Sequence, residues 1–219
     1  MQVSVIITCH NYARYLSRSI RSALNQSLDR KEYEIIVVDD GSTDETRKVM
    51  KTYGKNIRPV LLDTNIGLAA ARNEGIKTAL GRFVVNLDAD DYIDENLLMM
   101  ETIFMNLNSS WDAVSCDYFL VDENEKHIER ISGRDKPIAC GVMFRTDLLF
   151  EIGLYDEKFK MREEEDLRLR FEKNHIIHNI ELPLYRYRKH NDNMTNNSRG
   201  MNKYKKVLDT KHKTFRKRK

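Results

Sequence analysis

Four short runs rich in valine and isoleucine, separated by segments of helical character, constrain the fold of this chain more than any other feature. They are "VSVII" (3–7), "EIIVV" (34–38), "IRPVLL" (57–62) and "RFVVNL" (82–87). None alternates regularly between apolar and polar residues, which is typical of strands covered on both faces. Strands that alternate with helices indicate βαβ units. The pattern therefore predicts an α/β fold with a mainly parallel sheet.

The segments between these runs carry helical signals. Residues 16–24 place apolar side chains on one stripe, and "GLAAARNEGIKTALG" is rich in alanine. The segment "STDETRKVMKTYG" opens with Ser42 and Glu45 at the spacing of a capping box and closes at Gly54. We expect a helix in each segment, with the alanine-rich helix ending at Gly81.

The second half of the chain is less regular and predicts a small antiparallel portion. Helices are expected in "ENLLMMETIFMNL", "RTDLLFEIG" and "EEEDLRLRFEKN", antiparallel strands in "DAVSCDYFLVD" and "KHIERIS", and an extended segment in "PLYRYRKH". No internal repeat and no linker rich in proline or glycine marks a domain boundary. We therefore expect one domain over residues 1–198, followed by a helical tail over residues 199–219.

The tail differs sharply in charge from the rest of the chain. Residues 199–219 carry a net charge of +9, the remaining residues carry −6, and the whole chain carries +3. Met201, Tyr204, Leu208 and Phe215 recur at helical spacing. Three interpretations stay open: a terminal helix docked on its own domain or frayed, a basic amphipathic helix at an anionic membrane surface, and a nucleic-acid-binding segment. The acidic body, which lacks any recognition motif, argues against nucleic acid as a partner.

The cysteines and the hydropathy of the chain indicate the cellular compartment in which the protein works. Cys9, Cys116 and Cys140 are far apart and form no CxxC pair, so neither a zinc site nor a disulfide framework is indicated. No stretch approaches the roughly 18 to 20 continuous apolar residues of a membrane span. The start "MQVSVIITCHNY" reads as a strand rather than a signal peptide. We expect a cytoplasmic protein, with peripheral contact at the inner face of the cell membrane as an open alternative. The oligomeric state is not indicated.

A dense group of carboxylates follows the fourth run, where the chain reads "VVNLDADDYIDE". Asp88 and Asp90, with Asp91 beside them, are two residues apart, so an extended backbone points both to the same side. Two like charges repel there unless a cation lies between them. Carboxylate oxygens suit Mg²⁺ or Mn²⁺, which completes its coordination with waters and phosphates. Capping of the following helix is the alternative, but Asp94 stands closer to its start.

A second carboxylate pair, Asp39 and Asp40, follows the second run in "VVDDGSTDET". In an open parallel sheet, ligands bind beyond the carboxyl ends of the strands, so both carboxylate groups would lie over one cleft. A carboxylate can accept a hydrogen bond from the ring N–H of uracil or from ribose hydroxyls. Turn formation is the alternative, because Asp-Gly-Ser favours a turn by itself.

Four segments together resemble, in order and spacing, the inverting nucleotide-sugar transferases of glycosyltransferase family 2. They are "VSVIITCHNYARYLSRSIRSALNQS", "YEIIVVDDGSTDET", "NIGLAAARNEGIKTALGRFVVNLDADD" and "CGVMFRTDLLFEIGLYDEKFKMREEEDLRLRF". The resemblance extends from about Val3 to His190. It implies the GT-A fold, a Rossmann-like, mainly parallel sheet flanked by helices with a small antiparallel acceptor-side portion. It also implies a nucleotide half over about residues 1–95 and an acceptor half over about residues 96–198.

The resemblance implies a nucleotide site at the tips of the first strands. Asp40 would bind the uracil ring, with Asp39 beside it. Arg72 would contact the base or a phosphate, the alternative being a surface position on its helix. His10 stands where the family often has a tyrosine, which puts the identity of the base in doubt. The full implied set is Thr8, His10, Asn11, Asp39, Asp40, Arg72, Asp88 and Ala89.

The resemblance also implies metal and proton-transfer chemistry. Asp90 would hold Mn²⁺ or Mg²⁺ against the diphosphate, and His190 would complete this metal site or contact the diphosphate, the alternative being a surface histidine. In "REEED", Glu165 and Asp166 match the family's Glu-Asp pair, and Asp166 would be the general base for an acceptor hydroxyl. The two preceding glutamates leave this register open by a residue, and an acidic helix start favoured by the dipole is the alternative. The residues implied near the sugar or the acceptor are Asp91, Glu165, Cys140 and Gly141.

The resemblance implies a hexosyltransferase that works by metal-assisted single displacement. It would move a sugar from a nucleotide donor, UDP-sugar first, to a hydroxyl of a glycan or lipid-linked glycan, as in polysaccharide biosynthesis. A nucleotidyltransferase of similar fold is one alternative, although "SVIITCHNYARYL" lacks the glycine-rich phosphate loop of that class. A non-catalytic sugar-nucleotide-binding domain is the other. A glycosidase would use two carboxylates without a metal–diphosphate cluster.

Overall fold

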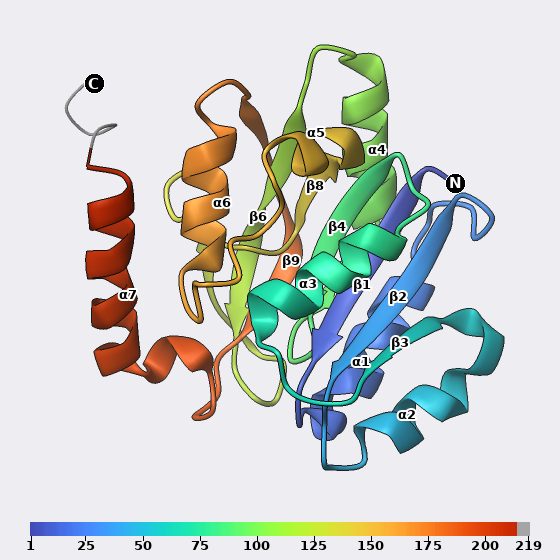
Figure 1. The fold of residues 1–219 in the computed structure, drawn as a ribbon. Helices are drawn as coiled ribbons and strands as arrows, with labels where there is room; N and C mark the ends of the chain where they lie inside the picture. The colour runs from blue at the N-terminus through green and yellow to red at the C-terminus, as the bar shows by residue number, and fades with distance from the viewer. Residues whose placement is uncertain (214–219) are drawn as a thin grey trace.

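One continuous sheet runs through the protein, as the computed structural model shows for residues 1–213 (Figure 1). Along the sheet of these described residues, the order is β3 (Arg58–Leu62), β2 (Tyr33–Asp40), β1 (Val3–Cys9), β4 (Phe83–Asp88), β8 (Val142–Arg145), β6 (Ala113–Val121), β9 (Ile177–Arg188) and β5 (Tyr92–Ile93). A further strand, β7 (His127–Ile131), pairs with β6. The mixed α/β fold and the parallel pairing of the first strands are as expected.

The four strands expected from the Val/Ile-rich runs form the parallel part, in the order β3-β2-β1-β4. Its register brings the polar strand ends together: Thr8 is paired with Asp88, and Cys9 with Asp39. The chain leaves β1 toward β2 on one side and later returns to β4 on the other. Such a reversal of strand order opens a crevice at the carboxyl edge. The register therefore places the first strand tip between the two aspartate groups.

The second half adds the antiparallel portion. Strand β8 runs antiparallel to both β4 and β6, and β7 runs antiparallel to β6, which confirms the expected strand pair. Strand β9 lies parallel to β6 over the extended segment anticipated near residues 183–190. Strands β5 and β8 were not expected, because two and four residues are too few to show a period. The β4–β8 pairing carries the sheet across the boundary proposed near residue 95.

Helices cover both faces of the sheet, which explains the absence of polar alternation in its strands. Side chains of α1 (Ala13–Leu24), α2 (Thr46–Tyr53) and α4 (Leu97–Leu107) pack in one hydrophobic core. Side chains of α3 (Leu68–Thr78), α5 (Thr146–Glu151) and α6 (Glu163–Phe171) pack in a second core on the opposite face, which is nearer the viewer in Figure 1. Two 3₁₀ turns, η1 (Gly54–Asn56) and η2 (Met194–Asn196), complete the short elements.

Two expected helix boundaries are wrong. The capping box does not form, because α2 begins at Thr46 and the Ser42 hydroxyl accepts a hydrogen bond from the N–H of Asn11 instead. Gly54 does end that helix, with φ 49°. Helix α3 ends at Thr78, three residues before Gly81. A Cβ at Gly81 would lie 2.5 Å from the backbone nitrogen of Ser4, so this glycine permits close packing on β1 rather than helix termination.

The basic tail begins as a helix, α7 (Ser198–Lys211), that is docked on the domain. The Arg162 guanidinium donates to the carbonyl of Met201 at 2.9 Å, and the rings of Phe159 and Tyr204 lie 6.2 Å apart. Phe215, assigned to the same apolar stripe, lies outside the described residues. No helix within residues 1–213 combines the length and apolar character needed to cross a membrane.

Candidate active site

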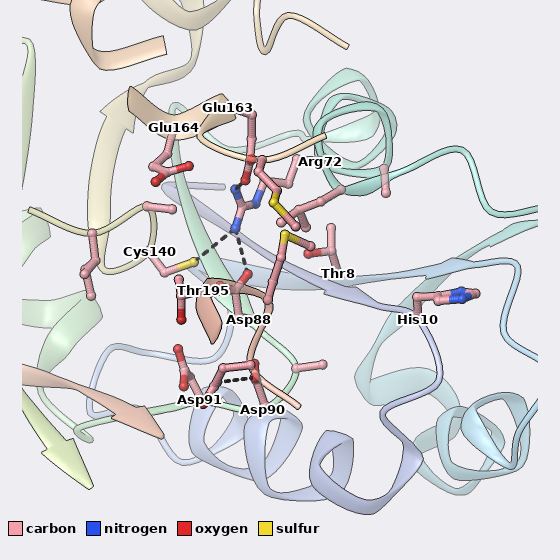
Figure 2. Close-up of a pocket in the computed structure, with 18 of the residues that line it drawn as sticks. Thr8, His10, Arg72, Asp88, Asp90, Asp91, Cys140, Glu163, Glu164 and Thr195 are labelled. Carbon is pink, nitrogen blue, oxygen red and sulfur yellow. Dashed lines mark hydrogen bonds and ion pairs between the residues drawn. The ribbon is translucent and has the colours of Figure 1, made fainter. Parts of the chain in front are cut away.

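The carboxyl edge of the parallel strands opens into a cavity of about 610 Å³ (Figure 2). Most of the residues expected in the site line it: Thr8, His10, Asp40, Arg72, Asp88, Ala89, Asp90, Asp91 and Cys140. Six expected residues do not line it: Asn11, Asp39, Gly141, Glu165, Asp166 and His190. The expected residues that line the cavity thus come from the first half of the chain, except for Cys140, which lies in a loop of the second half.

Arg72 joins the two halves of the site. It is the largest fully buried side chain of the described residues, with 1% of its surface exposed. Its Nη2 donates to Asp88 on β4 and its Nη1 to Glu163 on α6, each at 2.8 Å. Burial lowers the pKa of Arg72, but the charges of Asp88 and Glu163 outweigh it, so the pKa lies well above the usual value. A surface position for Arg72 is excluded, and its salt bridges fix α6 relative to β4.

The acidic cluster, Asp88, Asp90 and Asp91, is as compact as a metal site. One oxygen from each carboxylate lies within 4.8 Å of the others. Burial, and next the negative charge of Asp88, raises the pKa of Asp90. Burial and the charge of Asp90 raise the pKa of Asp91 well above its usual range. A divalent cation would relieve this repulsion, and an all-oxygen donor set fits Mg²⁺ or Mn²⁺.

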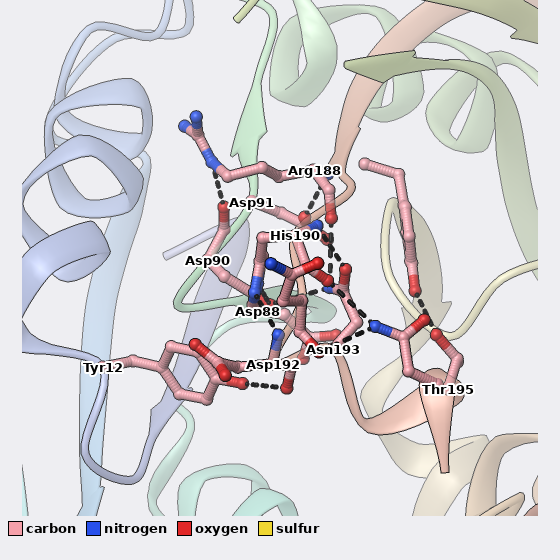
Figure 3. Close-up of polar contacts among 12 residues, drawn as sticks. Tyr12, Asp88, Asp90, Asp91, Arg188, His190, Asp192, Asn193 and Thr195 are labelled. Carbon is pink, nitrogen blue, oxygen red and sulfur yellow. Dashed lines mark hydrogen bonds and ion pairs between the residues drawn. The ribbon is translucent and has the colours of Figure 1, made fainter. Parts of the chain in front are cut away.

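The segment after β9 closes over this cluster (Figure 3). His190 Nε2 lies 2.8 Å from Asp90 Oδ2, and the amide of Asn193 lies 3.4 Å from the same oxygen. Asp91 accepts hydrogen bonds from the Tyr185 hydroxyl at 2.7 Å and from the N–H of Arg188 at 2.8 Å. The Asp90 carboxylate is thus contacted by two side chains of the segment after β9, whereas the Asp91 carboxylate is contacted by two residues of β9.

A further part of the cavity wall lies at the end of β2, beside the segments that follow β2 and β3. Asp40 accepts hydrogen bonds from the N–H groups of Ile66 and Gly67, at 2.7 and 3.0 Å. Asp39 is fully buried and bound to Arg47 Nε at 2.6 Å, so it supports the loop and does not face the cavity. Asn11 likewise accepts from the N–H of Thr43, at 2.8 Å. Of these expected nucleotide contacts, the cavity presents Asp40 and His10.

The first turn of α6 gathers four acidic residues, and the structure separates them. Asp166 is fully buried away from the cavity, where Arg170 Nε, Lys211 Nζ and His212 Nε2 lie 2.7 to 2.8 Å from its oxygens. Burial raises the pKa of Asp166, but hydrogen bonds from Lys211, His212 and Arg170 outweigh it and lower the pKa. A carboxylate bound in this way is a poor proton acceptor. Asp166 is therefore held inside the fold by α7 and its own helix, and it does not face the cavity.

Glu164, two residues before the expected base Asp166, is the acidic residue of this turn that lines the cavity together with Glu163. Its side chain is half-buried and lines the cavity near Cys140 (Figure 2). Burial, and then the charge of Glu163, raises the pKa of Glu164 to about 7. Glu165 is instead paired with Arg162. The i, i+4 pair formed by Asp166 and Arg170 was a sequence signal that Asp166 is used inside its own helix.

The loop before β8 contributes packing at the cavity wall. The Cys140 thiol is buried 3.6 Å from Arg72 Nη2, and burial raises its pKa well above the usual value, so it is not a ready nucleophile. Gly141 has φ 66°, and a Cβ there would lie 2.8 Å from the Tyr185 ring, so only glycine fits. Sequence reasoning did not anticipate an apolar part of the wall, formed by Ile138, Met161, Tyr187, Met194 and Met201.

Known proteins with similar sequences are glycosyltransferases. The chain is 30% identical over 207 residues to an uncharacterized glycosyltransferase of Rickettsia bellii, covering 89% of this chain and 30% of that protein. It is 34% identical over 113 residues to the Staphylococcus aureus poly(ribitol-phosphate) beta-N-acetylglucosaminyltransferase TarS, covering 50% of this chain and 20% of TarS. The chain thus spans well under half the length of these curated relatives.

Solved structures with the same fold support this relationship. TarS residues 1–349 in complex with UDP-GlcNAc match with a TM-score of 0.78 and 25% identity, covering 90% of this chain and 61% of that one. The mannosyltransferase PcManGT from Pyrobaculum calidifontis, in complex with GDP-Man and Mn²⁺, matches with a TM-score of 0.70 and 18% identity, covering 88% of this chain and 58% of that one. Both neighbours have the GT-A fold. The family model for glycosyl transferase family 2 matches residues 4–186, and this chain therefore belongs to glycosyltransferase family 2.

Proposed function

We propose that this domain transfers a sugar from a nucleoside-diphosphate donor to an acceptor hydroxyl by a single, inverting displacement. One observation carries the proposal: a carboxylate with a pKa near neutrality, Glu164, lines the same cavity as the acidic cluster. A displacement of this kind needs a base at the attacking hydroxyl and charge stabilisation at the leaving diphosphate. The cavity offers both.

The donor would lie along the strand tips. Thr8, His10 and Asp40 would border the nucleoside, with Asp88 and Ala89 near the ribose. The complexes of TarS with UDP and with UDP-GlcNAc favour UDP as the nucleotide, whereas PcManGT holds GDP-Man. Arg72 is committed to Asp88 and Glu163, so we assign it to shaping the sugar side of the cavity rather than to the base.

Asp90 would hold a divalent cation, Mn²⁺ or Mg²⁺, with Asp88 or Asp91 and with His190. When bound, such an ion neutralises the charge that grows on a departing diphosphate. His190 already lies 2.8 Å from Asp90, and its other ring nitrogen lies 3.2 Å from the N–H of Asp192. The bound Mn²⁺ of PcManGT is consistent with this assignment.

Glu164 would take the proton of the acceptor hydroxyl as that oxygen attacks the anomeric carbon. Its raised pKa suits a base that works near neutral pH. We assign this role to Glu164 in place of Asp166, because Asp166 is buried under α7. We propose a glycan or lipid-linked glycan as the acceptor, as in surface polysaccharide assembly. Contact of the basic tail with an anionic membrane is part of the same proposal.

A thermal-shift screen of UDP-, GDP-, dTDP- and CMP-sugars, each with Mn²⁺ or with EDTA, tests the donor class. A ligand that binds the native state raises the melting temperature by mass action. We expect the largest shift from a UDP-sugar with Mn²⁺ and loss of that shift in EDTA. The donor found in this screen is then incubated with the protein. If its sugar is neither hydrolysed nor transferred, the protein is a sugar-nucleotide-binding domain and not a transferase.

A further inference from the structure

A second cavity, of about 150 Å³, adjoins the first. It is lined by residues of α6, of strands β6, β8 and β9, and of the loop over residues 133–141. The two cavities share Pro137, Ile138, Ala139, Cys140 and Glu164. The loop is therefore the partition between them, and Glu164 is the one carboxylate of the described residues that lines both.

The second cavity adjoins the proposed base at the end of the first cavity remote from the acidic cluster. Figure 2 shows Glu164 on one side of the first cavity and Asp90 and Asp91 on the other, with Cys140 and Asp88 between them. A hydroxyl entering from the second cavity would reach Glu164 from the side away from the diphosphate. In-line displacement requires this arrangement, since the attacking and leaving oxygens lie on opposite sides of the anomeric carbon.

Two arginines that line the second cavity, Arg134 and Arg168, have no acidic partner among residues 1–213. Arg134 is exposed on the loop, and Arg168 is half-buried on α6. Within residues 1–213, neither guanidinium forms a hydrogen bond or an ion pair with another residue. The neighbouring Arg162 and Arg170 both form salt bridges with acidic side chains of α6. Arg134 and Arg168 are therefore available to an external anion.

Three glutamates line the second cavity. Glu164 is the proposed base, Glu165 is paired with Arg162, and Glu172 is exposed just after the end of α6. Phe144 and Leu167 are among the apolar residues that line the same cavity. A planar guanidinium presents a fork of donors that matches phosphate oxygens. A phosphate ester, whose carbon skeleton can contact these apolar side chains, therefore fits the cavity better than a free phosphate ion.

We propose that the second cavity receives the acceptor and that Arg134 and Arg168 bind a phosphate group on it. This inference rests on the proposed function, because it takes Glu164 as the base that the acceptor must reach. It adds the chemical class of the acceptor, a phosphate ester that carries a free hydroxyl. The phosphate could belong to a soluble polyol phosphate or to a lipid headgroup.

Ligand-observed NMR with glycerol 1-phosphate and with glycerol tests the proposal. UDP and Mg²⁺ are present in excess, so that the diphosphate site is filled. We expect glycerol 1-phosphate to bind the natural protein, glycerol to bind far more weakly, and the double variant Arg134→Gln/Arg168→Gln to bind the phosphate about tenfold more weakly. Arg21→Gln, an exposed residue on α1 at the opposite face of the sheet, is the matched control and should change nothing.

Equal binding to the double variant, or no preference for the phosphate over glycerol, would overturn the inference. The thermal stabilisation by UDP with Mg²⁺ is measured on each variant as a test of the donor site alone. A variant that keeps this stabilisation but loses glycerol 1-phosphate binding has lost only the acceptor site.

A second experiment measures binding to vesicles of phosphatidic acid in phosphatidylcholine and to vesicles of pure phosphatidylcholine. Arginine-dependent binding to the former assigns the phosphate to a lipid, whereas binding of glycerol 1-phosphate alone assigns it to a soluble polyol. Vesicle binding that persists in the double variant belongs to the basic tail and counts against a lipid acceptor at the arginines.

Discussion

Glu164 is the residue on which the proposed chemistry depends most. Substitution Glu164→Gln keeps the shape of the side chain but removes its proton affinity, so we expect kcat to fall about 10² to 10⁴-fold. Binding of UDP should stay within about twofold, since Figure 2 shows Glu164 well apart from His10, which borders the proposed nucleoside site. The matched control is Glu165→Gln, one residue further on the same turn and paired with Arg162. Steady-state kinetics and calorimetry measure the two effects, and unchanged turnover in Glu164→Gln would remove the base assignment.

The pH dependence follows from the same side chain. Because the pKa of Glu164 is raised from 4.5 to about 7, the active carboxylate form should appear as pH rises through about 7. The unfolded chain, with the lower pKa, binds fewer protons between these values, so the contribution of Glu164 to stability is lost as pH rises from 4.5 toward 7. Glu164→Gln should therefore lose the acidic limb of kcat/KM and be no less stable than the natural protein at pH 8. A limb that persists in the variant would assign the pKa to another group.

Asp90 offers a separate test of the metal site. Substitution Asp90→Ala removes one carboxylate of the acidic cluster, and we expect the Mn²⁺-dependent part of UDP binding to fall about tenfold or more. Calorimetric titration of UDP, with Mn²⁺ and again with EDTA, separates this part from binding of the nucleoside. Asp192→Ala, which removes an exposed pair with Arg14 on the same covering segment, serves as the control. Equal metal dependence in Asp90→Ala would contradict the assignment.

At the scale of elements, α6 and α7 depend on each other. Asp166 on α6 receives Lys211 and His212 from the end of α7, together with Arg170 from its own helix. Asp166→Asn should therefore destabilise the fold by about 1 to 3 kcal/mol, because it weakens several charge-assisted hydrogen bonds at once. The control Lys205→Ala changes an exposed residue of α7 and should cost less than about 0.5 kcal/mol. Urea denaturation measures both, and an unchanged midpoint for Asp166→Asn would show that α7 does not anchor α6.

The elements themselves were predictable to different degrees. The four runs of the parallel sheet and the seven α-helices of residues 1–213 were all anticipated, because each extends over enough positions to carry a local signal. Strand β8 has four residues and β5 has two, so neither carries a period, and each exists only because a longer strand lies beside it. The start of α2 was misjudged because Ser42 bonds to Asn11, a contact between residues 31 positions apart.

At the scale of the whole molecule, Arg72 ties the nucleotide side of the sheet to α6. Substitution Arg72→Gln would leave the carboxylates of Asp88 and Glu163 without their charged partner, and Glu163 is 4% exposed. We expect a loss of about 3 kcal/mol in the free energy of unfolding. Chemical denaturation checks this, with Arg82→Gln as an exposed control. A loss below about 0.5 kcal/mol would mean that the buried bridge does not stabilise the fold.

The sequence by itself determined the α/β class, the parallel strand tips and the acidic cluster, because these depend on residues close together in the chain. Only the tertiary structure decided which carboxylate of "REEED" faces the cavity. Successive residues of a helix point about 100° apart, so four adjacent acids face different surroundings, and the packing of α6 selects among them. It turned Glu164 toward the cavity and Asp166 toward α7, a helix some 40 residues further along the chain. Contacts between segments so far apart in sequence leave no local pattern from which to read them.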